Sequence, residues 1–258
     1  MTTFLKKLLL ITVAVSFCSS MAFAEKVRVG IAAEPYPPFT SPDASGNWVG
    51  WEIDIIKAVC EEAKLDYVIV PTAWDGLIPA LMSKKIDLIM NSMSITEARM
   101  KTIDFSDKYF NAPAVVIGAK TSGFDATPEG LSGKYLGVQT STIHKTYVEK
   151  YFTKAKIKDY LTQDEMLQDL VSGRIDAIQG DSLVLDTFIE SEEGRACCEV
   201  KGQVADDPVI LGAGVGAGVR KGDEGLKAKI NAAIAAIRAN GKYEEITKKY
   251  FNVDVYGQ

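Results

Sequence analysis

The sequence predicts an α/β protein of two lobes, in which each lobe is a mostly parallel sheet flanked by helices and two crossing strands join the lobes. Two observations predict this class. Segments with strand-like and helix-like spacing of apolar residues alternate along the chain, as in parallel sheets whose connections are helices. One stretch of the first half also recurs in the second half, which indicates that the same unit is built twice.

The first half contains three predicted strands separated by two predicted helices. An alternating pattern over residues 26–32 indicates a strand, and residues 52–64 carry apolar side chains at helical spacing. Residues 66–70 then predict a strand, residues 76–84 a helix and residues 86–90 a buried strand. This order is a βαβαβ run, which favours a parallel sheet.

The second half repeats this order. It has predicted strands at residues 135–138, 157–161 and 175–179, and predicted helices at residues 143–152 and 165–172. Residues 75–89 align with residues 164–178 and are identical at Asp75/Asp164, Leu81/Leu170, Ser83/Ser172, Ile86/Ile175, Asp87/Asp176 and Ile89/Ile178. Amphipathic units resemble one another, so the match alone is only suggestive.

The chain continues beyond this second unit. Residues 211–219 form a glycine-rich, strand-like run, and helical patterns follow at 223–239 and 242–250, with Asn240 and Gly241 as a C-cap between them. We therefore expect the chain to cross back and complete lobe 1. This assigns residues 25–114 and 211–258 to lobe 1 and residues 115–210 to lobe 2, with crossings near 113–119 and 206–212 that form a hinge.

Residues 1–24 have the pattern of a secretory signal peptide. Lys6 and Lys7 precede an apolar run over residues 8–17, and Ala22-Phe23-Ala24 is a small-x-small cleavage site. We expect cleavage after Ala24 and a soluble, periplasmic protein. Cys18 leaves lipid anchoring as a minor alternative, because the bulky Phe17 precedes it.

Composition excludes some classes of function. Cleavage leaves 258 − 24 = 234 residues, and loss of Lys6 and Lys7 takes the net charge from −5 to −7. With no dense basic cluster, nucleic-acid binding is not expected. Cys60 falls on the apolar face of a predicted helix and is interpreted as a buried small hydrophobe, whereas the adjacent Cys197 and Cys198 allow a vicinal disulfide without requiring one.

Residues 91–99, Asn-Ser-Met-Ser-Ile-Thr-Glu-Ala-Arg, follow a predicted buried strand and open a short helical pattern. The Arg99 guanidinium and the helix N-terminus favour a small carboxylate. The alternative is that Ser94 starts a capping box with Glu97 and that Arg99 is a solvated helix residue. The repeat places Asp181 at the position equivalent to Ser92, just past a strand end.

Two lobes whose strand ends face each other would bring Arg99 and Asp181 to one cleft. Arg99 then takes a carboxylate and Asp181 an ammonium, which together describe an α-amino acid. The alternative for Asp181 is a helix N-cap for residues 182–190. No Ser/His/Asp or metal-ligand cluster is visible in the sequence, so we expect no catalysis, no metal and no cofactor.

The chain resembles the polar amino-acid-binding proteins of ABC importers, a periplasmic family that includes histidine and lysine/arginine/ornithine binding proteins. The resemblance covers essentially the whole mature chain. It rests on residues 34–39 (EPYPPF), 50–54 (GWEID), 74–81 (WDGLIPAL), 92–96 (SMSIT) with Arg99, 173–177 (GRIDA) and 248–251 (KKYF). It implies the two-lobed periplasmic-binding-protein fold and a monomer that delivers a ligand to a membrane permease.

The resemblance also implies which residues bind the ligand. Tyr36 and Trp74 would sandwich its side chain, Arg99, Ser94 and Ser92 would hold its carboxylate, and Asp181 its ammonium. Ile143 stands where relatives have threonine, so only its backbone N–H could contribute. The predicted ligand-binding residues are Glu34, Tyr36, Trp74, Asn91, Ser92, Met93, Ser94, Arg99, Thr140, Thr142, Ile143 and Asp181. His144 is interpreted as a solvated first-turn residue.

The predicted ligand is a polar and basic amino acid, such as arginine, lysine, ornithine or histidine, or an opine. Cation-selective relatives carry an acid at the position of Ala33, and the neighbouring Glu34 either replaces that charge or points away. A dehydratase resembling cyclohexadienyl dehydratase is the enzyme alternative, with Glu34 as its proton donor. A receptor ectodomain is the third alternative, but the sequence given has no transmembrane segment after Phe251.

Overall fold

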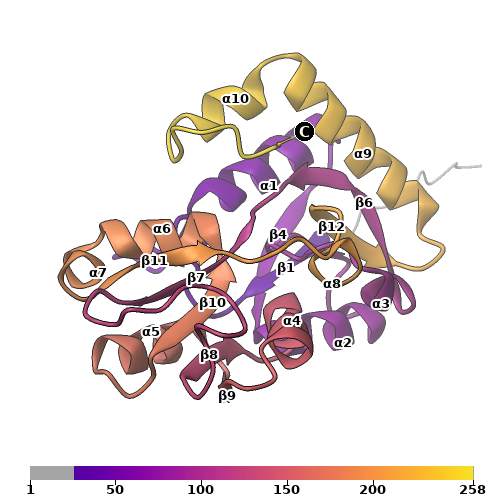
Figure 1. Ribbon diagram of the computed structural model, residues 1–258. Coiled ribbons are helices and arrows are strands. Elements are labelled where there is room, and N and C mark those ends of the chain that lie inside the picture. The colour runs from indigo at the N-terminus through magenta and orange to yellow at the C-terminus, as the bar shows by residue number, and fades with distance from the viewer. Residues whose placement is uncertain (1–25, 258) are drawn as a thin grey trace, which may run out of the picture.

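The computed structural model describes residues 26–257, which form two lobes, each built on one five-stranded sheet (Figure 1). The sheet of lobe 1 has the order β4-β1-β5-β12-β6, and that of lobe 2 the order β11-β7-β10-β8-β9. The strands of lobe 1 are β1 (Val27–Ala32), β4 (Tyr67–Thr72), β5 (Leu88–Ile89), β6 (Ile103–Phe110) and β12 (Val215–Arg220). Those of lobe 2 are β7 (Ala114–Ala119), β8 (Tyr135–Gln139), β9 (Lys156–Tyr160), β10 (Ala177–Asp181) and β11 (Cys198–Gln203).

Four strands of each sheet run in one direction and the fifth runs against them. The reversed strand is β12 in lobe 1 and β7 in lobe 2. Each of these is the first strand that the chain forms after it crosses from the other lobe, once after Phe110 and once after Gln203. The predicted fold class, two mostly parallel sheets joined by two crossings, is confirmed.

Helices cover both faces of the sheet in lobe 1. On one face lie α1 (Trp51–Glu62), α9 (Glu224–Ala239) and α10 (Lys242–Thr247), so the end of the chain packs beside α1 (Figure 1). Trp51, Phe39 and Phe110 are fully buried at the centre of this core. The other face is covered by a 3-10 turn (Trp74–Gly76), α2 (Leu77–Met82) and α3 (Glu97–Met100).

Lobe 2 is also covered on two faces. On one face α4 (Ile143–Tyr151) packs with α8 (Pro208–Leu211) against Val116 and Val138. On the other face α5 (Gln163–Val171) and α6 (Ser182–Glu190) pack against Ile117 and Ile178. The short α7 (Glu192–Cys197) leads into β11, and a hairpin of β2 (Ser41–Pro42) and β3 (Trp48–Val49) lies outside both sheets.

One element differs from the prediction. The strand expected over 211–219 begins only at Val215, and the expected crossing over 206–212 contains a helical turn, α8. Pro208 starts α8, because the Asp207 carboxylate caps it by accepting the backbone N–H groups of Val209 and Ile210. Gly212 ends the helix with a φ of 86°, and a Cβ there would lie 2.4 Å from the Ile95 carbonyl oxygen.

The cysteines and the N-terminal segment complete the comparison. Cys60 is fully buried, as predicted, and Cys197 and Cys198 form a disulfide where α7 meets β11. The predicted signal peptide, residues 1–24, lies outside the described residues. Within residues 26–257, none of the helices has the length and apolar character needed to cross a membrane.

Candidate functional site

A pocket lies between the lobes, at the carboxyl ends of strands from both sheets. Ala32 ends β1 and Asn91 follows β5 on one side, and Gln139 ends β8 and Asp181 ends β10 on the other. This is the edge at which open α/β sheets bind ligands. Ten of the predicted residues line it: Glu34, Tyr36, Trp74, Asn91, Ser92, Ser94, Arg99, Thr142, Ile143 and Asp181.

The remaining two predicted residues do not line the pocket. Met93 is buried in the core of lobe 1 with Leu77 and Leu81, because successive side chains of this extended segment point to opposite sides. Thr140 uses its backbone N–H to bond the carbonyl oxygen of Tyr160 at the end of β9. The proposal that these two bind ligand is therefore dropped.

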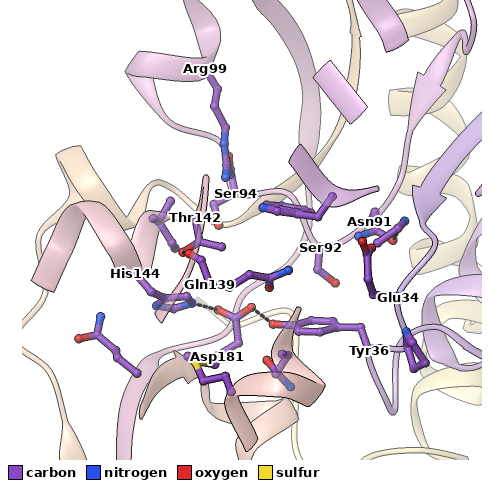
Figure 2. Close-up of a pocket in the computed structure, with 18 residues that line it drawn as sticks. Glu34, Tyr36, Asn91, Ser92, Ser94, Arg99, Gln139, Thr142, His144 and Asp181 are labelled. Carbon is purple, nitrogen blue, oxygen red and sulfur yellow. Dashed lines mark hydrogen bonds and ion pairs between the residues drawn. The ribbon is translucent and has the colours of Figure 1, made fainter. Parts of the chain in front are cut away.

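Arg99 projects from α3 toward the pocket (Figure 2). Its Nη1 donates to the Ser94 carbonyl oxygen at 2.9 Å, and its Nη2 to the Ser141 carbonyl oxygen of lobe 2 at 3.3 Å. The guanidinium lies 5.5 Å from the centre of the Trp74 ring. Burial lowers the pKa of Arg99 to about 10, while Asp181 acts to raise it, so the group stays cationic at neutral pH.

The capping-box interpretation of Ser94 is wrong. The N-cap of α3 is Thr96, whose hydroxyl accepts the backbone N–H of Arg99 at 3.2 Å. Ser94 instead forms a backbone bridge with Val215, so that the helix begins two residues later than the S-x-x-E pattern suggested. The alternative of a solvated Arg99 is wrong as well, since Arg99 is half-buried and bonds to both lobes.

Asp181 lies across the pocket from Arg99, and dashed lines in Figure 2 join it to His144 and Tyr36. One carboxylate oxygen accepts the Tyr36 hydroxyl at 2.6 Å, and the other lies 3.1 Å from Nε2 of His144. Burial acts against the charged form, but the hydrogen bond and charge of His144, the Tyr36 bond and the Arg99 charge hold the pKa of Asp181 below its ordinary value.

Asp181 occupies the N-cap position of α6, yet its side chain accepts no backbone N–H there. The interpretation of this carboxylate as a helix cap is therefore wrong. His144 is also not the solvated residue that was predicted, because it is buried in the first turn of α4. Its partner Asp181 lies at the end of β10, 37 residues further along the chain. Local sequence patterns do not reveal such a contact.

Asn91 and Ser92 line the pocket, and hydrogen bonds to other residues of lobe 1 fix their side chains. The Asn91 side-chain oxygen accepts the backbone N–H of Ala32 at 2.7 Å. Ser92 gives both its donors to Glu52: its N–H lies 2.7 Å from Oε1 and its hydroxyl 3.0 Å from Oε2. The Tyr109 hydroxyl also bonds to Glu52, and burial raises the pKa of Glu52 to about 7.

Buried polar atoms without a partner concentrate at this pocket. Among the described residues six such side-chain atoms occur, and only Thr40 Oγ1 lies away from the pocket lining. The other five are Glu34 Oε2, Trp74 Nε1, His144 Nδ1 and both amide atoms of Gln179. Because unsatisfied buried groups destabilise a fold, their clustering at one place is typical of a binding site.

Sequence reasoning missed several lining residues: Gln139, His144, Gln163, Met166 and Gln179. Gln179 could have been found, since it precedes Asp181 by two residues on β10 and strand alternation places both side chains on one face. Gln163 and Met166 come from α5, whose position over the strand ends is a tertiary property. Within residues 26–257 no group of three His, Cys, Asp or Glu residues could hold a metal ion.

Residues 27–253 match the family model of bacterial extracellular solute-binding proteins, family 3. The chain is 42% identical to the L-arginine-binding protein of Pseudomonas aeruginosa, over 98% of this chain and 99% of that protein. It is 38% identical to the histidine-binding periplasmic protein of Salmonella typhimurium, over 98% and 100% of the two chains. A solved structure of an ancestral arginine-binding protein bound to arginine is 34% identical and has a TM-score of 0.81, covering 88% of this chain and 98% of that one. The chain therefore belongs to the bacterial extracellular solute-binding proteins of family 3.

Proposed function

We propose that this protein captures a basic α-amino acid, arginine foremost, between its lobes and delivers it to the membrane permease of an ABC importer. The observation that carries the proposal is the placement of Arg99 and Asp181 on opposite sides of one pocket. A carboxylate pairs with the Arg99 guanidinium, and an ammonium pairs with the Asp181 carboxylate. The same arrangement favours α-amino acids over simple acids or simple amines.

The ligand side chain is proposed to lie between Tyr36 and Trp74. Three partnerless buried acceptors line the pocket: Glu34 Oε2, Gln179 Oε1 and, when Nε2 carries the proton toward Asp181, His144 Nδ1. A guanidinium carries five N–H donors in a plane, more than the three of an ammonium, and can stack on aromatic rings. This complementarity favours arginine among the basic amino acids.

Export to the periplasm, cleavage after Ala24 and function as a monomer belong to the same proposal. The relatives named as periplasmic binding proteins support export. Lobe bounds of 25–114 with 211–258 and 115–210 are part of the proposal, with Ala114 at the boundary as the first residue of β7. Closure of the lobes around the ligand would present surfaces of both lobes to the permease.

Isothermal titration calorimetry with the mature protein tests the proposal. Arginine, lysine, ornithine, histidine and octopine are compared with citrulline, which replaces one guanidinium nitrogen of arginine by oxygen. We expect arginine to bind at least about a hundredfold more tightly than citrulline, because citrulline lacks the charge that the pocket acceptors favour. Equal affinities for arginine and citrulline would contradict the proposal that the pocket selects a basic side chain.

The Arg99→Ala variant tests the carboxylate site. We expect binding to weaken by about a hundredfold or more, since the ligand carboxylate loses a charge-assisted pair. Arg195→Ala, which removes an exposed arginine of α7, is the matched control and should bind as the unchanged protein does. Unchanged affinity in Arg99→Ala would contradict the site. Incubation with prephenate, followed by detection of an aromatic product, tests the dehydratase alternative.

A further inference from the structure

Glu52 is a buried carboxylate that touches the pocket only through another residue. It lies in the first turn of α1 and is 0% exposed. Three donors converge on it: the N–H of Ser92, the hydroxyl of Ser92 and the hydroxyl of Tyr109. An ionised carboxylate only accepts hydrogen bonds, so each of these groups donates to Glu52 when it is charged.

These bonds restrict what Ser92 can offer to a ligand. Ser92 lines the pocket, and its φ of 49° is uncommon for a residue other than glycine. Its N–H and its O–H both point to Glu52, so only the lone pairs of the hydroxyl oxygen remain. A ligand carboxylate at this oxygen would bring acceptor against acceptor, whereas an N–H donor would find a partner.

We propose that Glu52 is a positioning residue that makes the Ser92 hydroxyl a hydrogen-bond acceptor, so that Ser92 and Asp181 hold the ligand ammonium from opposite lobes. The inference rests on the proposed function, because it needs an α-amino acid in the pocket. It moves Ser92 from the carboxylate half of the site, where the sequence resemblance placed it, to the ammonium half. Arg99 then holds the carboxylate without the Ser92 hydroxyl.

The charges around the pocket agree with this arrangement. The ionisable groups around Glu52 are Tyr109 from β6, Tyr36 from the loop after β1 and Asp181 from β10. Asp181 and Glu52 disfavour each other's charge, and a cation bound near both relieves this repulsion. With its pKa at about 7, Glu52 loses its charge in mildly acidic solution, and the protonated acid can then donate a hydrogen bond itself.

A double-mutant cycle with a matched ligand pair tests the inference. Arginine is compared with 5-guanidinopentanoate, which keeps the carboxylate and the guanidinium but lacks the α-ammonium. In Glu52→Gln the amide can accept the Ser92 N–H and donate to the hydroxyl oxygen, which frees the hydroxyl to donate instead. We expect Glu52→Gln to weaken arginine about tenfold at pH 8 and the analogue less than about threefold.

The Ser92→Ala background shows whether Glu52 acts through Ser92. There the Glu52→Gln change should weaken arginine by less than about threefold, because the hydroxyl that Glu52 orients is gone and only the effect of its charge remains. The pH dependence of binding gives an independent measure. The arginine affinity of the unchanged protein should rise as pH increases through about 7, by up to about tenfold per pH unit. In Glu52→Gln the increase that comes from ionisation of Glu52 should be absent. Comparison with Glu52→Gln assigns this part of the pH dependence to Glu52.

Three outcomes would overturn the inference. They are equal losses for arginine and its analogue, an unchanged Glu52→Gln effect in the Ser92→Ala background, and loss of the preference for arginine over the analogue in Tyr109→Phe. Tyr109→Phe is the folding control, because it removes one donor to Glu52 and leaves both Ser92 bonds in place. It should retain the preference for arginine over the analogue. If the unchanged protein fails to bind arginine at all, the proposed function fails instead.

Discussion

At the scale of single residues, the pocket combines groups that the sequence indicated with groups that only the fold brings together. Arg99 and Asp181 followed from strand ends and the internal repeat. His144 and Glu52 did not, because their roles depend on partners that lie 37 and 40 residues away. Local patterns predict helix starts and strand ends, but they carry no information on which buried polar groups meet.

Gln179 gives a prediction at this scale. It is 1% exposed and neither amide atom has a partner, which costs about 1–3 kcal/mol of stability. Gln179→Leu should therefore raise the melting temperature, and it should weaken arginine binding because the amide lines the pocket. The exposed Gln168→Leu change on α5 is the control and should alter neither. Lower stability in Gln179→Leu would show that the amide is satisfied within the fold.

At the scale of elements, most strands and helices agree with the predictions, because periodic spacing of apolar residues dominates their formation. The errors occur where a cap or a proline overrides the apolar pattern. Asp207 and Pro208 start α8 inside the segment 206–212, which was expected to be an extended crossing between the lobes. Thr96 rather than Ser94 starts α3, because two similar hydroxyls compete and only the folded chain decides between them.

The short helix α3 gives the element-scale prediction. It has four residues, and its cap is the Thr96 hydroxyl bonded to the N–H of Arg99. Thr96→Ala should cost about 1 kcal/mol of stability and should also weaken arginine binding, since Arg99 loses the bond that fixes its backbone. Chemical denaturation and calorimetry measure the two effects separately.

Ser191→Ala is the matched control for this prediction. Ser191 caps α7 by accepting the N–H of Gly194 at 3.1 Å, and it does not line the pocket. It should lose a similar amount of stability and keep its affinity. If both variants bind arginine equally well, the placement of Arg99 does not depend on the cap.

At the scale of the whole molecule, the two-lobed fold was predictable because the repeat and the return of the chain are both visible in the sequence. The contacts between the lobes were not predictable. The Tyr36 hydroxyl reaches Asp181, and Arg99 reaches the Ser141 carbonyl oxygen, so residues of both lobes meet at the pocket. Such contacts depend on the relative orientation of the lobes, which no local pattern determines.

The pH dependence of global stability gives the prediction at this scale. Burial raises the pKa of Glu52 from 4.5 to about 7, so between these values the folded state binds a proton that the unfolded state has released. This stabilising contribution is complete below about pH 4.5 and is lost as pH rises through about 7, by on the order of 3 kcal/mol. Urea denaturation between pH 5 and 8 measures it.

Glu52→Gln should abolish this part of the pH dependence, because glutamine does not titrate. Glu62→Gln, at an exposed position of the same helix, should leave the profile as it is in the unchanged protein. Parallel profiles for the unchanged protein and Glu52→Gln would mean that Glu52 stays ionised throughout this range.

The position of β12 affects the order in which the two lobes can be completed when the chain is made from its N-terminus onward. The sheet of lobe 2 has all its strands once Gln203 has been made, and its strands follow one another without interruption. In lobe 1, β5 and β6 are neighbours only through β12, which ends at Arg220. The lobe that starts first therefore finishes last. Until then β5 has an unpaired edge and β6 has no neighbouring strand, so both can attract other chains.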